Sequence, residues 1–255
     1  MRYFLEISYK GTKFNGFQAQ EAGINPSVKT IQGEINRVLK DLLGHEIASV
    51  GSGRTDTGVH CRKQFMHFDT TSEVKDKDNF LYRMNRLLPH DMLVSNIHSV
   101  REELSARFSA NSRSYEYHIT RLKNPFLTEL AYFYPIRNLD VGKMNEATKY
   151  LFQYTDFEAF SKVKTNVMSF VCHIKKAQWQ EEPNGKLVFY ISADRFLRGM
   201  VRAIVGTLLD VGKGTLSVED FEQVILSKDR RRAGRAVPPE GLYLVDVNYP
   251  SSIFL

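Results

Sequence analysis

Residues 53–58 read Gly-Arg-Thr-Asp-Thr-Gly, and this stretch, set between two predicted strands, says most about the fold and chemistry of the chain. A single carboxylate, Asp56, lies between Gly53 and Gly58, and the cationic Arg54 stands two positions before it. Glycines on both sides permit a tight backbone with little bulk. The stretch therefore predicts a loop at a strand end that exposes one carboxylate to a large ligand.

Two other interpretations of Asp56 have to be weighed. An aspartate between glycines is often a turn residue whose carboxylate accepts backbone hydrogen bonds. Asp56-Thr57-Gly58 also matches the Asp-Thr-Gly of aspartic proteases, in which two carboxylates share a proton. The chain has one such triplet, so a symmetric dimer would have to supply the second. Arg54 opposes that alternative, because a nearby guanidinium favours the ionised carboxylate.

The composition is typical of a globular protein with an anionic partner. The 255 residues permit one large domain or two of about 120 residues each. A net charge of +6 and a pI near 9.2 favour nucleic acid as that partner. No apolar run approaches the roughly 18 residues of a membrane span. Cys61 and Cys172 are too far apart to indicate a disulfide framework, which favours a reducing, cytoplasmic location.

No metal or cofactor is expected. Cys61 adjoins His60 and Cys172 adjoins His173, but neighbouring residues on a strand point to opposite faces. Paired zinc ligands are usually spaced by two to four residues. The sequence also has neither a P-loop nor a dinucleotide fingerprint.

Hydrophobic periodicity predicts an α+β fold made of two similar halves, residues 1–108 and 109–255. In the first half we expect strands at 2–9, 46–52, 63–70 and 92–100 and helices at 30–43 and 76–88. In the second half we expect strands at 113–120, 170–181, 186–193 and 242–248, helices at 141–152, 195–211 and 217–227, and a Pro183-Asn184-Gly185 turn. Each half then approximates β-α-β-β-α-β, the ferredoxin-like order. Joined edge to edge, the halves would form one extended, mixed, mostly antiparallel sheet with helices on one side and a face open for a ligand.

Further stretches strengthen the signal of the Asp56 loop. Residues 106–117 read Ala-Arg-Phe-Ser-Ala-Asn-Ser-Arg-Ser-Tyr-Glu-Tyr, and residues 196–206 read Phe-Leu-Arg-Gly-Met-Val-Arg-Ala-Ile-Val-Gly. With 51–60, 11–18 and the ending at 240–250, they resemble motifs of the tRNA pseudouridine synthase A (TruA) family, in the family's order. The departures are small: Thr57 stands for the family's usual Ala, and Phe17 for its Trp.

The resemblance implies a pseudouridine synthase fold and the conversion of uridine to pseudouridine at positions 38, 39 and 40 of the tRNA anticodon stem-loop. It further implies a tRNA partner, a homodimer, and no cofactor or metal. Because the target base lies in or beside a paired stem, the enzyme would have to extrude it from the stack.

The resemblance also implies roles for individual residues. Asp56 would act on the sugar as nucleophile or base, and Arg202 would hold its carboxylate ionised and oriented. Tyr115 would stack on the flipped uracil. Arg54 would contact RNA near the extruded nucleotide. Arg198, four residues before Arg202, is interpreted either as a solvated residue of the same helix or as a substrate phosphate contact.

Two questions stay open at this level. The arginines at 230, 231, 232 and 235 form either a solvated segment or a set of phosphate contacts. A non-catalytic tRNA-binding module would share the basic charge and the aromatic residues, but it would have no need to pair Asp56 with Arg202.

Overall fold

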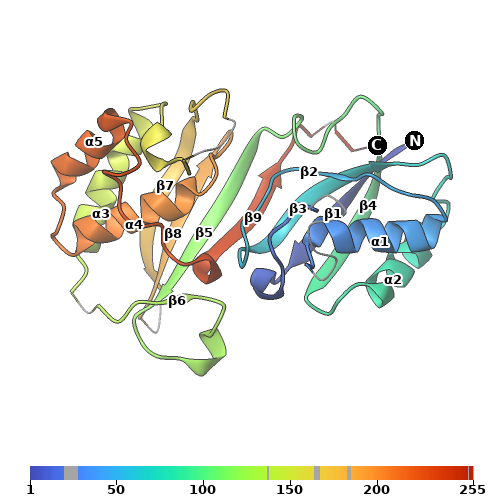
Figure 1. The fold of residues 1–255 in the computed structure, drawn as a ribbon, viewed down its shortest axis with the longest axis horizontal. Helices are drawn as coiled ribbons and strands as arrows, with labels where there is room; N and C mark the ends of the chain where they lie inside the picture. The colour runs from blue at the N-terminus through green and yellow to red at the C-terminus, as the bar shows by residue number, and fades with distance from the viewer. Residues whose placement is uncertain (20–27, 137, 164–166, 183–184, 252, 255) are drawn as a thin grey trace. The chain divides into compact units, whose positions relative to one another are not determined.

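The computed structural model describes residues 1–19, 28–136, 138–163, 167–182, 185–251, 253 and 254. They form an α+β fold with mostly antiparallel strand pairing, divided into two compact units (Figure 1). Unit 1 comprises Met1–Asn111 and Tyr243–Leu255, and unit 2 comprises Ser112–Leu242. The expected division at 108/109 lies close to the first boundary, but the C-terminal segment belongs with unit 1.

Unit 1 is a four-stranded sheet in the order β4-β1-β3-β9. The strands are β1 (Arg2–Tyr9), β3 (His60–Asp69), β4 (Met92–Val100) and β9 (Leu242–Asn248). β1 runs antiparallel to β3 and β4, whereas β9 pairs parallel with β3. The strand expected at 46–52 is reduced to β2 (Val50–Gly51), which pairs with β3. β9, which was expected as the last strand of the second half, pairs with β3 through His60–Tyr243 and Cys61–Leu244.

Two capped helices accompany this sheet and lie side by side (Figure 1). α1 (Ile31–Leu43) begins where the Thr30 side chain accepts a hydrogen bond from the Gly33 amide. It ends at Gly44, whose φ of 79° is the left-handed conformation that glycine adopts readily. α2 (Lys77–Leu87) is capped in the same way by Asp76 and packs against β4.

Side chains on both faces of β1 are buried. The alternating residues Tyr3, Leu5, Ile7 and Tyr9 are buried, and Phe4 is fully buried as well. The Phe4 ring lies edge-on to Tyr249 and Phe254, with centroids 5.8 and 6.3 Å away. The C-terminal segment therefore covers part of the sheet face that we expected to be open for a ligand.

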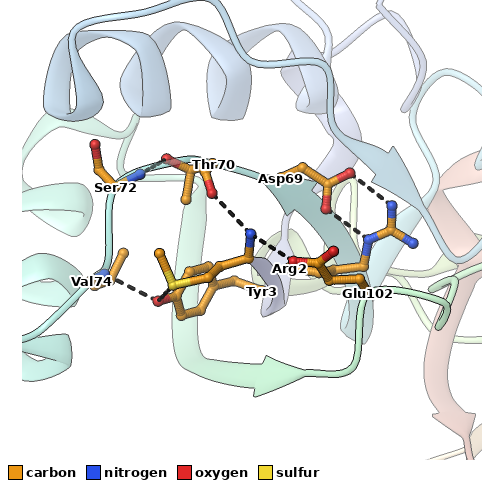
Figure 2. A network of polar contacts seen from close by, with 8 residues as sticks. Arg2, Tyr3, Asp69, Thr70, Ser72, Val74 and Glu102 are labelled. Carbon is orange, nitrogen blue, oxygen red and sulfur yellow. Dashed lines mark hydrogen bonds and ion pairs between the residues drawn. The ribbon is translucent and has the colours of Figure 1, made fainter.

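Polar contacts anchor the first residues of β1 (Figure 2). The Arg2 guanidinium donates to both carboxylate oxygens of Asp69, at 2.8 and 2.7 Å. The Tyr3 hydroxyl, at the same end of the strand, accepts from the Val74 amide at 3.1 Å. These contacts hold together the start of β1, the end of β3 and the segment that follows β3.

Unit 2 is an antiparallel sheet in the order β5-β8-β7, with the two-residue β6 paired parallel to β5. Its strands are β5 (Ser112–Thr120), β6 (Tyr132–Phe133), β7 (Ile174–Glu182) and β8 (Lys186–Ala193). Its helices are α3 (Val141–Thr148), α4 (Met200–Gly212) and α5 (Val218–Ser227), and α3 packs against both of the others. The Asp140 side chain caps α3 by accepting a hydrogen bond from the Lys143 amide. Residues 183 and 184 of the expected turn lie outside the described residues.

α4 begins five residues later than expected. Gly199 has a φ of 73°, a left-handed conformation that interrupts helical geometry immediately before Met200. Phe196 and Arg198 therefore precede the helix, and the interpretation of Arg198 as a residue of the same helix as Arg202 is wrong. Met200, Ile204 and Leu208 form a buried stripe on α4.

No helix in the described ranges is long and apolar enough to cross a membrane.

Candidate active site

Asp56 lies in the loop between β2 and β3, and its side chain is half-buried. The backbone carbonyl of Asp56 accepts from the Val59 amide at 3.2 Å, which closes a tight turn. Gly58, inside that turn, has a φ of 80° that disfavours any residue with a Cβ. Asp56 thus begins this turn through its backbone carbonyl, and the residue is partly accessible while Arg54 is exposed.

The local backbone does not explain why residue 53 is a glycine. Its φ is outside the left-handed region, and a Cβ built on it would meet nothing within 4 Å. The fold of the described residues therefore does not require glycine at this position.

Residues 11–18 form a second segment that packs against the Asp56 loop and hydrogen-bonds to it. The Gly11 amide donates to Nδ1 of His60 at 3.1 Å, and a Cβ on Gly11 would lie 2.0 Å from the Val59 carbonyl oxygen. The Phe17 amide donates to the Thr55 carbonyl at 3.0 Å. The Phe17 ring is buried against Gly51, where a Cβ would come within 2.3 Å of ring carbons. This aromatic residue thus packs behind the Asp56 loop.

Four buried polar side chains form a second set of contacts that holds the Asp56 loop in place. The Tyr9 hydroxyl shares a hydrogen bond of 2.8 Å with the Thr55 hydroxyl and accepts from Nε2 of Gln64 at 2.9 Å. The Ser52 hydroxyl donates to Oε1 of Gln64 at 3.4 Å. Sequence reasoning missed this set, because its contacts join residues up to 55 positions apart. No local signal marks Gln64, which directly follows Arg62 and Lys63 in a strand of mixed polarity.

Tyr115 lies on β5 in unit 2 and is half-buried. Its ring meets Phe196 edge-on, with centroids 5.1 Å apart and planes at 86°. Nη1 of Arg113 donates to the Asp194 carbonyl at 2.9 Å, which ties β5 to the turn that carries Phe196. Tyr117 is fully buried and its hydroxyl donates to the Pro238 carbonyl at 2.7 Å, so it is a core residue, as expected.

Arg202 lies in the first turn of α4. Its Nε donates to the Val237 carbonyl at 2.6 Å, and the Val237 amide donates back to the Arg202 carbonyl at 3.2 Å. Nearby, the Gly234 amide donates to the Thr207 hydroxyl at 2.8 Å. Residues 233–238 thus run against α4 and fix the plane of the Arg202 guanidinium. Arg198 is exposed, ahead of the helix.

The arginines at 230–235 are not equivalent. Nη1 of Arg230 donates to the carbonyls of Ala233 and Gly234, so this guanidinium stabilises the loop itself. Arg231 pairs with Asp229, and this ion pair lowers the pKa of Asp229 to about 2. Arg232 and Arg235 are exposed.

The described residues contain no group of three His, Cys, Asp or Glu side chains that would suit a metal ion. Cys61 is buried, and burial raises the pKa of its thiol far above the ordinary value, which disfavours the thiolate that binds metals. His60 already accepts a hydrogen bond through Nδ1.

The candidate residues are divided between the two units. Unit 1 carries Asp56 and Arg54, and unit 2 carries Tyr115, Arg198 and Arg202.

Comparison with known proteins adds an independent line of support. Residues 147–250 match the family model described as tRNA pseudouridine synthase. The chain is 47% identical over 254 residues to tRNA pseudouridine synthase A of Parabacteroides distasonis, covering 99% of this chain and 98% of that protein. It is 40% identical over 252 residues to the Bacillus licheniformis protein of the same name, covering 98% and 99%. Identity of this extent over whole chains decides the matter, and the chain belongs to the tRNA pseudouridine synthase A family.

Proposed function

We propose that this protein isomerises uridine to pseudouridine at positions 38, 39 and 40 of the tRNA anticodon stem-loop. The observation that carries the proposal is the ordered Asp56 loop. A chain of this family keeps one partly accessible carboxylate on a turn that two neighbouring segments hold in place. Its net charge of +6 suits a polyanionic substrate.

The reaction requires a carboxylate and neither a redox step nor net hydrolysis. The bond from uracil N1 to ribose C1′ breaks, the base rotates, and C5 bonds to C1′ while the C5 proton leaves and N1 is protonated. The ionised carboxylate of Asp56 acts in one of two ways. It attacks C1′ and forms a covalent sugar ester, or it removes a ribose C2′ proton and gives a glycal.

Arg202 is proposed to hold Asp56 ionised and oriented. The Nε of Arg202 donates to the Val237 carbonyl, and this hydrogen bond restricts the orientation of the guanidinium. This role requires the two units to join edge to edge into one extended sheet with helices on one side. The N-terminal half, 1–108, then contributes the Asp56 loop, and the C-terminal half, 109–255, contributes the Tyr115 strand and the Arg202 helix.

The remaining candidate residues are proposed to bind the extruded nucleotide. Tyr115 stacks on the flipped uracil and assists removal of the C5 proton, and Phe196 holds the edge of its ring. Arg54 contacts RNA at the gap that the flipped base leaves. Arg198, exposed before α4, contacts a phosphate of the substrate.

The proposed partners are tRNA, recognised mainly by shape and phosphates, and a second copy of this chain. The proposed location is the cytoplasm, where the buried, unpaired Cys61 and Cys172 stay reduced.

Pseudouridine mapping on an unmodified tRNA tests the proposal. Wild-type protein, Asp56→Ala and Asp78→Ala are incubated with the same transcript. Asp78 is the matched control, since it is an exposed carboxylate on α2. We expect new pseudouridine in the anticodon arm with wild type and Asp78→Ala and none with Asp56→Ala, whose tRNA affinity stays near that of wild type.

Other outcomes would change the assignment. Tight tRNA binding without product from wild type would favour a non-catalytic binding module. Loss of tRNA binding in Asp56→Ala would mean that the carboxylate has a structural role.

A further inference from the structure

We propose that Tyr9 is a positioning residue for the Asp56 loop, an inference that rests on the proposed function. Tyr9 is the last residue of β1 and is 5% exposed. Its hydroxyl lies 2.8 Å from the hydroxyl of Thr55, the residue immediately before Asp56. A buried phenol of the sheet is therefore in direct contact with the loop that carries the reactive carboxylate.

The contact belongs to a chain of side chains that starts and ends on this loop. From Ser52 it passes to the amide of Gln64, then to the Tyr9 hydroxyl and finally to Thr55. Gln64 is fully buried and uses both ends of its amide in this chain. Ser52 and Thr55 bracket Gly53 and Arg54, so the chain fixes both ends of the segment that presents Arg54.

The hydroxyl of Tyr9 matters because it and its partners Thr55 and Gln64 are buried. A buried polar group left without a partner is costly, so the loop is most stable where Thr55 meets Tyr9. The Thr55 carbonyl is also held, by the Phe17 amide at 3.0 Å. Residue 55 is thus fixed through main chain and side chain, one position from Asp56. Misplacement of a reacting group by about 1 Å can cost about 100-fold in rate.

The test compares Tyr9→Phe with Tyr3→Phe. Both tyrosines are buried on β1, 5% and 3% exposed, and each hydroxyl makes a hydrogen bond. The Tyr3 hydroxyl serves the Val74 amide instead of the Asp56 loop (Figure 2). We expect similar decreases in Tm for the two variants. Only Tyr9→Phe should lower kcat, by about 10- to 100-fold, with tRNA affinity unchanged.

Two further measurements separate positioning from general destabilisation. Thr55→Val removes the other hydroxyl, and the double variant should turn over no more slowly than the slower single variant. Amide hydrogen exchange at Phe17 and Val59, which donate to loop carbonyls, should be faster in Tyr9→Phe and unchanged in Tyr3→Phe.

Equal kcat values for Tyr9→Phe and Tyr3→Phe, or additive effects in the double variant, would overturn the inference. An inactive wild-type enzyme would instead overturn the proposed function. In that case the exchange rates still decide whether Tyr9 holds the loop.

Discussion

Gly206 of α4 lies directly against the backbone of Arg235: a Cβ at position 206 would stand 1.9 Å from the Arg235 carbonyl oxygen. The contact is between two backbones, so no side chain can move to relieve it. It allows residues 233–238 to reach α4, where Val237 holds Nε of Arg202.

Gly206→Ala should therefore weaken both the fold and catalysis. In an open helix this change stabilises by about 1 kcal/mol. Here overpacking against a carbonyl should outweigh that gain and lower the free energy of unfolding by about 1–3 kcal/mol. Urea unfolding measures the first effect, and pseudouridine formation well below the unfolding midpoint measures the second. A stabilised, fully active variant would contradict the close approach.

Gly53→Ala and Gly58→Ala should have different effects on the stability of the protein. Gly58 has a φ of 80°, so alanine there should destabilise by about 1 kcal/mol. At Gly53 the surroundings are open, and alanine should leave stability unchanged or raise it by up to about 1 kcal/mol. If RNA approaches the backbone at Gly53, the variant will still lose turnover. Full activity of stable Gly53→Ala would show that no such approach occurs.

Arg202→Ala should lower kcat by about 100-fold or more, because Asp56 would lose the guanidinium proposed to orient it. Affinity for tRNA should change little. Arg231→Ala is the matched control, because it removes an arginine that pairs only locally with Asp229. Single-turnover rates and filter binding supply both quantities. An unaltered rate in Arg202→Ala would remove this residue from the site.

The exposed arginines 232 and 235 should contribute to the salt dependence of tRNA binding. Replacing either by glutamine should reduce the slope of log K against log salt by about 1 if it contacts a phosphate. Arg230→Gln should act differently. Its guanidinium bonds the Ala233 and Gly234 carbonyls, so its loss should reduce stability by about 1–3 kcal/mol. If all variants had the same slope as wild type, these arginines would face solvent and would not contact phosphates of the tRNA.

His67 should make unit 1 less stable as the pH falls. It is 7% exposed and its Nδ1 accepts from the Ala106 amide, and burial lowers its pKa below the ordinary 6.5. Between the unfolded and folded pKa values the unfolded chain binds the proton more tightly, so stability declines from about pH 6.5 downward. His67→Gln keeps an acceptor without titrating. Urea midpoints at about pH 7.5 and 5.5 should therefore differ less in His67→Gln than in wild type.

Elements governed by local signals were predicted closely. Thr30 and Gly44 mark the ends of α1, and the bounds of β1, β4 and β9 are those expected. The start of α4 was missed because Gly199 was treated as an ordinary helical residue, whereas its positive φ ends the preceding turn. The pairing of β9 with β3 was not predicted for another reason. β3 lies about 180 residues earlier in the chain, and hydrophobic periodicity carries no information about pairing over that distance.

The same contrast holds for the candidate site. The motif around Asp56 was visible as a string of adjacent residues, so its loop could be predicted. The role of Tyr9 depends on contacts with residues 46 and 55 positions away, and Tyr9 does not look different from an ordinary core aromatic. Sequence patterns thus identified the residues proposed to react, but not the buried contacts of Tyr9 with Thr55 and Gln64.

The return of β9 to unit 1 also affects how the protein is made. β1 and β3 leave the ribosome before unit 2, but His60 and Cys61 gain their partners in β9, and Phe4 the rings of Tyr249 and Phe254, only when residues 243–254 appear. At about 5–20 residues per second, the roughly 130 residues between delay that step by about 6 to 26 seconds. The sheet next to the Asp56 loop thus gains this strand only after the whole of unit 2 has been synthesised.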